Sequence, residues 1–206
     1  IIDTDWLVRR IRAANERRLH VGLGPGTPTT GYRVVFGESD SIPGLVIDRY
    51  DSAVVLQLST AGLEQMRPMI LDAVRQVLDP AVIVERSDLS VRKDDGLAEY
   101  SAVHLWNGPG PITFLENGIR YQVDLVNGQK TGFYLDQRDL RQTVQALASG
   151  RRVLNLFSYT GSMGVAALLG GAMEVLNVDS SVVALEQCTI NAELNGLPRH
   201  KMHTEA

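Results

Sequence analysis

The residues best suited to ligand chemistry lie where two apolar runs end. Residues 153–157 read as a buried strand that ends in the loop Ser158-Tyr159-Thr160-Gly161, and residues 174–178 read as a second strand that ends on Asp179. Backbone N–H groups of a tight loop before a helix bind polar ligand groups, and an acid after the next strand accepts hydrogen bonds from ribose hydroxyls. This layout predicts a site for a cofactor that contains a nucleoside.

The loop differs in composition from the loops that bind phosphates. Bulkier residues stand where the first two glycines of Gly-x-Gly-x-x-Gly would be, and no lysine follows in the position of a P-loop. A ligand with a ribose and no phosphate fits better, which favours S-adenosylmethionine. The loop alone leaves an alternative open, an ordinary strand-turn-helix followed by a surface aspartate that caps the next helix.

A second candidate segment mixes polar, charged and aromatic residues just before a helix. Its candidate cofactor-binding residues are Lys130, Thr131, Gly132, Phe133, Asp136, Gln137 and Arg138. Arginine or lysine here is suited to pair with a carboxylate, Asp136 with an ammonium group, and Phe133 to pack against a cation. The alternatives are that Phe133 belongs to the core and that Asp136 and Arg138 form a charge cluster at a helix N-terminus.

Residues 127–138, 156–161 and 178–181 together resemble one family closely, the bacterial 23S rRNA 5-methylcytosine methyltransferases. These are class I S-adenosylmethionine enzymes with an N-terminal PUA domain, and residues 32–40, 42–50 and 85–88 are similar to their middle domain. The resemblance covers about residues 2–196. Besides the second segment, it implies these cofactor-binding residues: Asn155, Phe157, Ser158, Tyr159, Thr160, Gly161, Asp179 and Ser180. Asn155 departs from the acid that is common at its position in other class I methyltransferases.

Beside that family the chain is expected to be a fragment that does not methylate by itself. The PUA domain is expected before Ile1, and an Asp-Pro-Pro loop and a nucleophilic cysteine are expected beyond Ala206, so no catalytic residue is predicted within the chain. For the intact protein, the resemblance implies methyl transfer to C5 of a flipped cytosine in 23S rRNA, after a downstream cysteine has added to C6. The alternatives are another rRNA position, such as a guanine, and a non-catalytic RNA-binding or dimerisation module, with a homodimer left open.

Composition predicts a cytoplasmic protein without a membrane span. The chain has 206 residues, 44% of them hydrophobic, a formal charge of −4 and a single cysteine. That cysteine, Cys188, has no basic neighbour and is expected to be a small buried residue. The histidines show no metal-binding spacing, and no metal is predicted; they are His20, His104, His200 and His203, the last two at an irregular C-terminus. The arginines of residues 9–18 suit RNA phosphates or a solvated helix face equally well.

The expected fold class is α/β. An α+β middle domain in residues 1–126 is followed in residues 127–206 by the first βα units of a truncated Rossmann-like class I methyltransferase fold. Helices are predicted over residues 5–19, with Asp5 as the cap, and over 63–78 and 135–148. A meander of strands is expected over residues 32–38, 45–50 and 53–58, another strand over 81–85, and a hairpin over 112–125, while residues 88–100 read as irregular.

Overall fold

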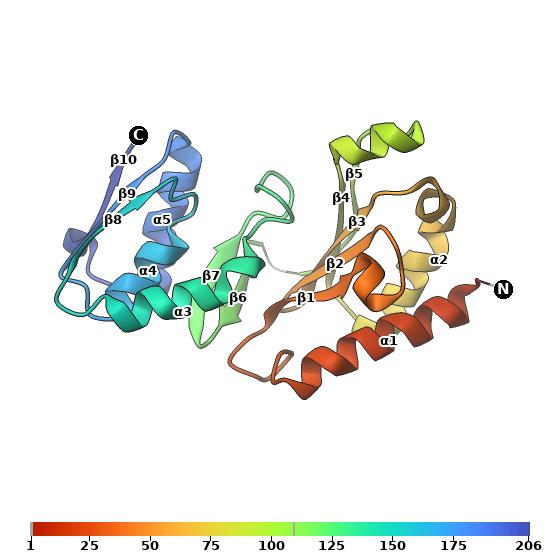
Figure 1. Ribbon diagram of the computed structural model, residues 1–206, viewed down its shortest axis with the longest axis horizontal. Coiled ribbons are helices and arrows are strands. Elements are labelled where there is room, and N and C mark those ends of the chain that lie inside the picture. Colours follow the sequence, from red (N-terminus) through yellow and green to blue (C-terminus); the bar gives the residue numbers. More distant parts are fainter. Residues whose placement is uncertain (1, 109) are drawn as a thin grey trace. The chain divides into compact units, whose positions relative to one another are not determined.

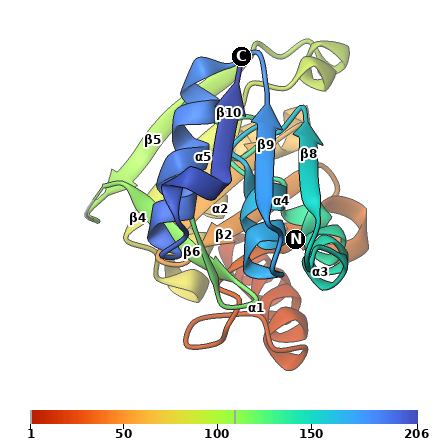
Figure 2. The same ribbon diagram turned by 90° about the vertical axis from the view of Figure 1, so that its left-hand side faces the viewer.

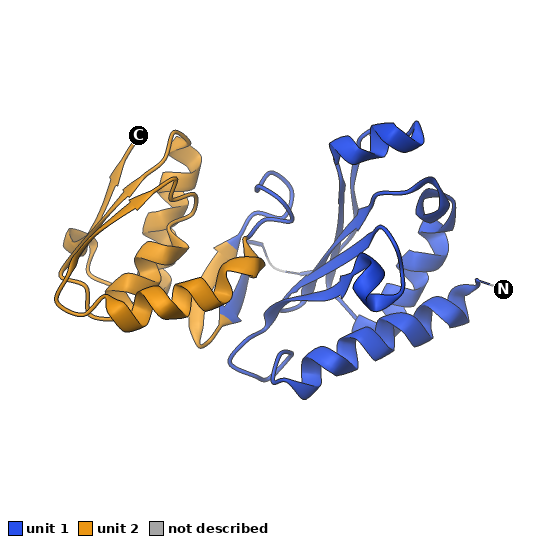
Figure 3. Ribbon diagram, in the orientation of Figure 1, with its two compact units in different colours: residues 1–115, 123–133 blue, residues 116–122, 134–206 orange. Residues whose placement is uncertain are grey.

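The computed structural model describes residues 2–108 and 110–206, and the chain divides into two compact units. Unit 1 comprises residues 1–115 and 123–133, and unit 2 comprises residues 116–122 and 134–206 (Figure 3). The two units alternate along the chain near the predicted boundary at residue 126. Residues 116–122, which contain the turn and most of the second strand of the predicted hairpin, belong to unit 2, whereas residues 123–133 belong to unit 1. Among the described residues, no helix is long and apolar enough to cross a membrane.

Unit 1 is a five-stranded sheet with helices α1 (Thr4–His20) and α2 (Ala61–Leu78) packed on one face (Figure 1). Its strands follow chain order: β1 (Gly31–Phe36), β2 (Leu45–Tyr50), β3 (Ala53–Leu58), β4 (Val82–Ser87) and β5 (Tyr100–Trp106). The predicted antiparallel meander β1–β3 is confirmed, and β4 pairs parallel to β3 after the α2 crossover. The edge strand β5 was not predicted, since its residues alternate poorly and its pairing is irregular opposite Ile83 and Val84.

Helix α1 begins where a carboxylate caps its first turn. The cap is Asp3, whose Oδ1 accepts a hydrogen bond from Trp6 N at 2.8 Å, so the predicted cap at Asp5 was wrong by two residues. Leu7, Ile11 and Ala14 recur at helical spacing and are buried against the sheet. The helix therefore follows from the sequence pattern, although its exact start does not.

Unit 2 contains a three-stranded parallel sheet with the strand order β10-β9-β8 (Figure 2). The strands are β8 (Arg152–Leu156), β9 (Glu174–Val178) and β10 (Met202–Glu205), and the helices are α3 (Arg138–Leu147), α4 (Ser162–Leu169) and α5 (Val182–Leu194). The expected α/β class is confirmed. Strand β10, which contains His203, corrects the prediction of an irregular C-terminus.

The predicted hairpin is formed by β6 (Ile112–Glu116) and β7 (Ile119–Val123). Its turn is Asn117-Gly118, with φ of 51° and 80°, the left-handed backbone that a tight hairpin turn requires. In unit 2, the last residue of β6, Glu116, pairs with Arg141 of α3 at 2.6 and 2.8 Å, and both side chains are only 1% exposed. Arg141 also donates to Tyr134 O at 2.9 Å, so a buried ion pair ties the hairpin turn to α3.

In unit 1, a buried carboxylate ties α1 to the turn after β1. Asp40 Oδ1 accepts from Arg17 and Arg18 at 2.6 Å, and Asp40 Oδ2 accepts from Arg18 and from Phe36 N at 2.7 Å. Burial by itself raises the pKa of a carboxyl, but these hydrogen bonds outweigh burial and lower the pKa of Asp40 to about 2.

This link should make unit 1 sensitive to acid. Because the pKa of Asp40 drops from its ordinary 3.8 to about 2 on folding, its contribution is complete above about pH 4 and is lost as the pH falls towards 2. Such a shift corresponds to about 2 kcal/mol. Urea unfolding followed by tryptophan fluorescence reports on this unit, since both tryptophans, Trp6 and Trp106, lie in it. Asp40→Asn should destabilise it strongly at pH 6 and little at pH 2.5; equal losses at both would contradict the assignment.

Candidate functional site

The loop between β8 and α4 holds three residues in left-handed backbone conformation. Phe157, Tyr159 and Gly161 have φ of 54°, 47° and 71°, and they alternate along the loop. For a bulky aromatic residue this conformation is strained, at a cost of about 1–3 kcal/mol each, and it persists only where surrounding contacts enforce it. Two strained aromatic residues in the loop predicted to bind a ligand are consistent with a functional site.

Asp179 fixes this loop at the carboxyl ends of the parallel strands. Its Oδ2 accepts a hydrogen bond from Tyr159 N at 2.8 Å, and its Oδ1 accepts from Ser181 N at 3.0 Å. Ser158 N donates to Val178 O at 3.0 Å beside it. The N-cap of α5 is Ser181, whose hydroxyl accepts from Ala184 N, so Asp179 supports the cap without being it. The loop and the acid predicted from sequence are thus brought together.

The glycines of the loop region serve internal packing. A Cβ on Gly161 would lie 2.6 Å from Cys188 Sγ, and a Cβ on Gly164 would lie 2.6 Å from Asn177 Oδ1. Gly161 therefore lets α5 approach the loop, and Gly164 lets α4 approach strand β9.

Helix α5 supports the loop from within the unit through two side chains. Cys188 Sγ donates to Tyr159 O at 3.3 Å, and Asn191 Nδ2 donates to Thr160 O at 2.9 Å. Cys188 is fully buried, as predicted, and burial raises the pKa of its thiol to about 12, so it is no nucleophile at neutral pH. Asn191 was missed; the available signal was an amide at a position on the buried side of a helix, where asparagine is disfavoured unless it is hydrogen-bonded.

The remaining predicted residues of this loop region differ in exposure. Phe157 is 92% exposed, while Ser158 and Thr160 are buried. Asn155 Nδ2 donates to Asn177 Oδ1 at 2.8 Å in a cross-strand pair of β8 and β9, which gives Asn155 a partner inside the unit. Ser180 is exposed next to Asp179.

Lys130, Thr131, Gly132 and Phe133 belong to unit 1, where the sheet holds them. Thr131 Oγ1 donates to Asp48 Oδ2 at 2.7 Å and shares a hydrogen bond of 2.8 Å with the hydroxyl of Tyr50. Phe133 is buried, with its ring edge-on to Phe114 at 4.9 Å between centroids. The side chains of Thr131 and Phe133 thus have structural contacts, as the core alternative for Phe133 anticipated. Lys130 is exposed, and Gly132 has a φ of 116° that favours glycine.

Asp136, Gln137 and Arg138 belong to unit 2, at the start of the helical segment. Leu135–Gln137 form a 3-10 turn, and α3 begins at Arg138. Asp136 is exposed, and Arg138 Nε lies 3.8 Å from Glu116 Oε2, within the buried ion-pair cluster. The structure therefore separates the second candidate segment into a part in each unit.

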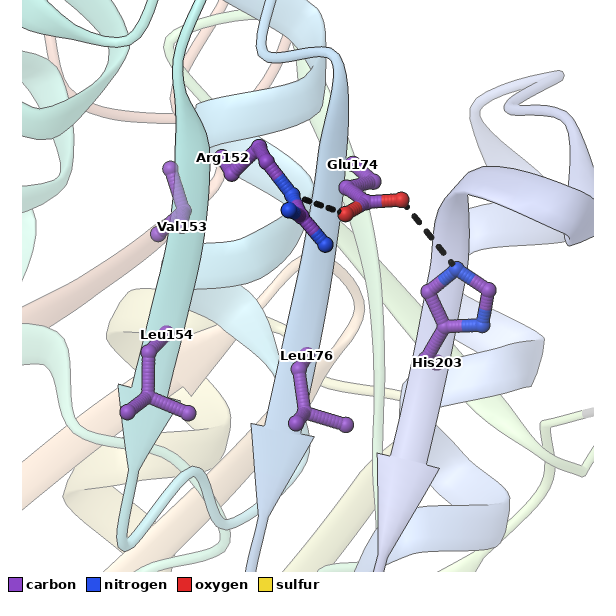
Figure 4. Close-up of a pocket in the computed structure, with 6 residues that line it drawn as sticks. All are labelled: Arg152, Val153, Leu154, Glu174, Leu176 and His203. Carbon is purple, nitrogen blue, oxygen red and sulfur yellow. Dashed lines mark hydrogen bonds and ion pairs between the residues drawn. The ribbon is translucent and has the colours of Figure 1, made fainter.

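A shallow pocket lies elsewhere on unit 2, at the amino ends of the strands. It is lined by Arg152, Val153, Leu154, Glu174, Leu176 and His203. Figure 4 shows Leu154 and Leu176 side by side on neighbouring strands, with Glu174 between Arg152 and His203. Ligands of parallel α/β sheets bind at the carboxyl ends of the strands. The pocket is therefore distinct from the loop at Asp179.

The groups around Asp179 fit a cofactor with a ribose and an amino-acid end. A carboxylate has about four acceptor positions, and the two internal hydrogen bonds of Asp179 leave capacity for ribose hydroxyls. Thr160 Oγ1 is buried and has no hydrogen-bond partner among the described residues. The loop therefore offers a ligand one unsatisfied polar atom. The N-terminus of α4 starts directly after the loop and favours a carboxylate there.

Comparison with known proteins agrees with this geometry. A family model described as S-adenosylmethionine-dependent methyltransferase matches residues 92–203. Over 197 residues the chain is 48% identical to a ribosomal RNA large subunit methyltransferase I from Aeromonas salmonicida, covering 95% of the chain and 49% of that protein. A protein of the same name from Erwinia tasmaniensis is 45% identical over 203 residues, with 98% and 51% covered. The chain thus spans about half the length of the curated relatives it matches.

A solved structure shares the fold over nearly the whole chain. That protein was crystallised in complex with SAH (S-adenosylhomocysteine), is 30% identical to this chain and gives a TM-score of 0.83. The match covers 99% of this chain and 52% of that one. The Rossmann-like arrangement predicted from sequence is therefore confirmed.

The packing of Gly161 on Cys188 can be tested against a second left-handed glycine. Gly196 follows α5 with a φ of 66°, and a Cβ there would meet nothing within 4 Å. Gly196→Ala should cost only the conformational penalty, about 1–2 kcal/mol. Gly161→Ala should cost at least about 1 kcal/mol more, because the new methyl group overpacks the contact with Cys188. Hydrogen exchange of peptides from α4 measures the opening free energy; equal effects of the two substitutions would argue against tight packing.

Proposed function

This chain belongs to the family of S-adenosylmethionine-dependent methyltransferases, and from that membership we propose that unit 2 binds the methyl donor at residues 157–161 and Asp179. The observation that carries the proposal is the carboxylate of Asp179, which is hydrogen-bonded to the strained loop at the carboxyl ends of β8 and β9. S-adenosylmethionine is the cofactor of the family and supplies an electrophilic methyl group. The chain's part is to bind and orient it.

Each group at the loop has a distinct role in this proposal. Asp179 accepts hydrogen bonds from ribose hydroxyls, and Ser180 lies beside it. The N-terminus of α4 holds the methionine carboxylate, with Thr160 Oγ1 as an additional polar group. The amides of Ser158, Tyr159 and Gly161 already donate within the unit and shape the loop. Phe157 offers an aromatic ring, 92% exposed, for contact with the adenosyl group or the sulfonium.

The second candidate segment and Asn155 stay predictions from the sequence. Lys130, Gly132, Asp136, Gln137 and Arg138 are proposed to contact the donor on the strength of the resemblance. Thr131 and Phe133 have buried side chains, so in this proposal only their backbone groups contact the donor. The side chain of Asn155 is hydrogen-bonded to Asn177.

We propose that the whole protein methylates C5 of a cytosine in 23S rRNA. The support is the name of the relatives, ribosomal RNA large subunit methyltransferase I, together with the resemblance in the sequence. Such a reaction needs a cysteine thiolate that adds to C6 of the base. Cys188 does not meet that need, because it is buried and its thiol pKa is about 12. Within this chain the proposed role is donor binding.

The position of the catalytic residues stays a prediction as well. The relatives are about twice as long as the stretch that this chain matches, which leaves room in them for the Asp-Pro-Pro loop and the nucleophilic cysteine that the resemblance implies beyond Ala206. The proposal assigns donor binding to this chain and places methyl transfer in the part of the relatives that the chain does not match. It predicts donor binding without methyl transfer to 23S rRNA by this chain, and methylation by it would contradict the assignment.

Two alternatives make different predictions about rRNA. Methylation of a guanine would use the same donor site without a thiolate, and a non-catalytic RNA-binding or dimerisation module would bind RNA whether or not Asp179 is present. Nucleoside mass spectrometry of 23S rRNA, with and without the gene in its own organism, separates them. Loss of one 5-methylcytidine supports the proposal, loss of a methylguanosine favours the first alternative, and unchanged rRNA contradicts both enzymatic assignments.

Calorimetric titration of S-adenosylhomocysteine into this chain tests the donor site. Saturable binding with one ligand per chain is expected. Asp179→Ala should weaken it by about 1–3 kcal/mol, or roughly 5–150-fold, because a charged hydrogen-bonding group is lost.

Glu186→Ala provides the matched control for that titration. Glu186 is an exposed carboxylate on α5 of the same unit, so its removal changes the net charge by the same amount away from the loop. The control should bind like the unmodified chain. If the unmodified chain produces no binding heat at millimolar ligand, or if the two variants weaken binding equally, the proposed donor site is wrong.

A further inference from the structure

We propose that Asn191 is a positioning residue for the donor loop and acts through the backbone carbonyl of Thr160. Asn191 is completely buried, and it lies inside α5 rather than at either cap, which are Ser181 and Asn195. A buried amide is stable only when its donors and acceptors are paired. The partners of this amide therefore indicate what it does.

The amide of Asn191 links two segments that are distant in sequence. Its Nδ2 donates to Thr160 O at 2.9 Å, and its Oδ1 accepts from Gln122 N of strand β7 at 2.9 Å. Gln187 Nε2 adds a long hydrogen bond to Oδ1 at 3.5 Å. All these residues belong to unit 2. One side chain thus sets the distance between the hairpin edge and the loop.

The contact to Thr160 matters because it fixes the direction of a peptide group. Thr160 lies between the left-handed residues Tyr159 and Gly161. The thiol of Cys188 is a weaker donor to the carbonyl of Tyr159, at 3.3 Å, and divides its single hydrogen between that carbonyl and Ala184 O at 3.4 Å. When consecutive carbonyls are held by α5, the peptide planes of the loop cannot rotate freely. The N–H of the Thr160–Gly161 peptide donates to Ser158 O at 2.9 Å, so this peptide is held at both of its polar groups. The loop then keeps one conformation, which is the property that a preorganised binding loop requires.

Asn195, one turn later, makes a similar contact that does not reach the loop. Its Oδ1 accepts from Arg120 N at 2.9 Å, and its Nδ2 donates to Arg120 O at 2.7 Å and to Asn191 O at 2.8 Å. Both asparagines therefore bind the edge of β7, but of the two only Asn191 also holds the loop. This difference separates loop positioning from general attachment of the hairpin.

The inference rests on the proposed function, because positioning of the loop matters for the donor only if the donor binds there. The test uses the same substitution at the two asparagines, Asn191→Asp and Asn195→Asp. Aspartate keeps the acceptor for the N–H of β7 and removes the donor. Asn191→Ala is a second variant for the event that a buried carboxylate prevents folding.

Two readouts are measured on each folded variant. Hydrogen exchange of peptides covering residues 156–165, without ligand, should accelerate about tenfold or more in the Asn191 variants and less than about threefold in Asn195→Asp. Affinity for S-adenosylhomocysteine should fall about tenfold or more in the Asn191 variants and less than about threefold in Asn195→Asp.

The outcomes distinguish this inference from the proposed function. If the unmodified chain does not bind S-adenosylhomocysteine, the proposed function fails, and the hydrogen exchange of the loop still decides whether Asn191 holds it. If the unmodified chain binds but both Asn191 variants exchange and bind like Asn195→Asp, the positioning role is refuted while the donor site stands.

Discussion

The architecture of unit 2 depends on the buried ion pair between Glu116 and Arg141. Both side chains are 1% exposed, so removal of either partner would leave an unpaired charge inside the unit, at a cost of about 3–5 kcal/mol. That is a large part of the roughly 5–15 kcal/mol by which a typical domain is stable. The pair fixes the hairpin turn to α3, and Arg141 also holds Tyr134 O just before that helix. With the hairpin fixed, β7 offers the edge to which the asparagines of α5 bind.

Contacts between β7, α5 and the loop connect this ion pair to Asp179. Helix α5 is held by β7 on one side and holds the carbonyls of Tyr159 and Thr160 on the other. Asp179 binds the amide of Tyr159 from the end of β9. The strained conformation of Tyr159 is therefore enforced by several independent contacts. A loop held in one conformation places the N-terminus of α4 and Asp179 in fixed positions for the proposed donor.

Much of this could be predicted from sequence because the signals were local. The strand-loop-strand pattern around residues 153–179, the Asn-Gly hairpin and the helical spacing of α1 depend on neighbours in the chain. Strands β5 and β10 were missed because their pairing partners, not their own residues, define them. Asn191 was missed because its role comes from a contact with Thr160, 31 residues away. The burial of Thr131 was hidden for the same reason, since Asp48 lies 83 residues from it.

Because the chain's only thiol is buried, its rate of alkylation reports how often unit 2 opens. Alkylating reagents attack thiolates, and Cys188 is both enclosed and shifted to a thiol pKa of about 12, so the closed form is inert to them. Modification proceeds only through openings that separate α5 from the loop beneath Tyr159 and Gly161. The labelling rate therefore measures how often those openings occur, without a fluorophore or an engineered probe. A ligand that binds the closed loop lowers the labelling rate, because it reduces the fraction of molecules in which the loop is open.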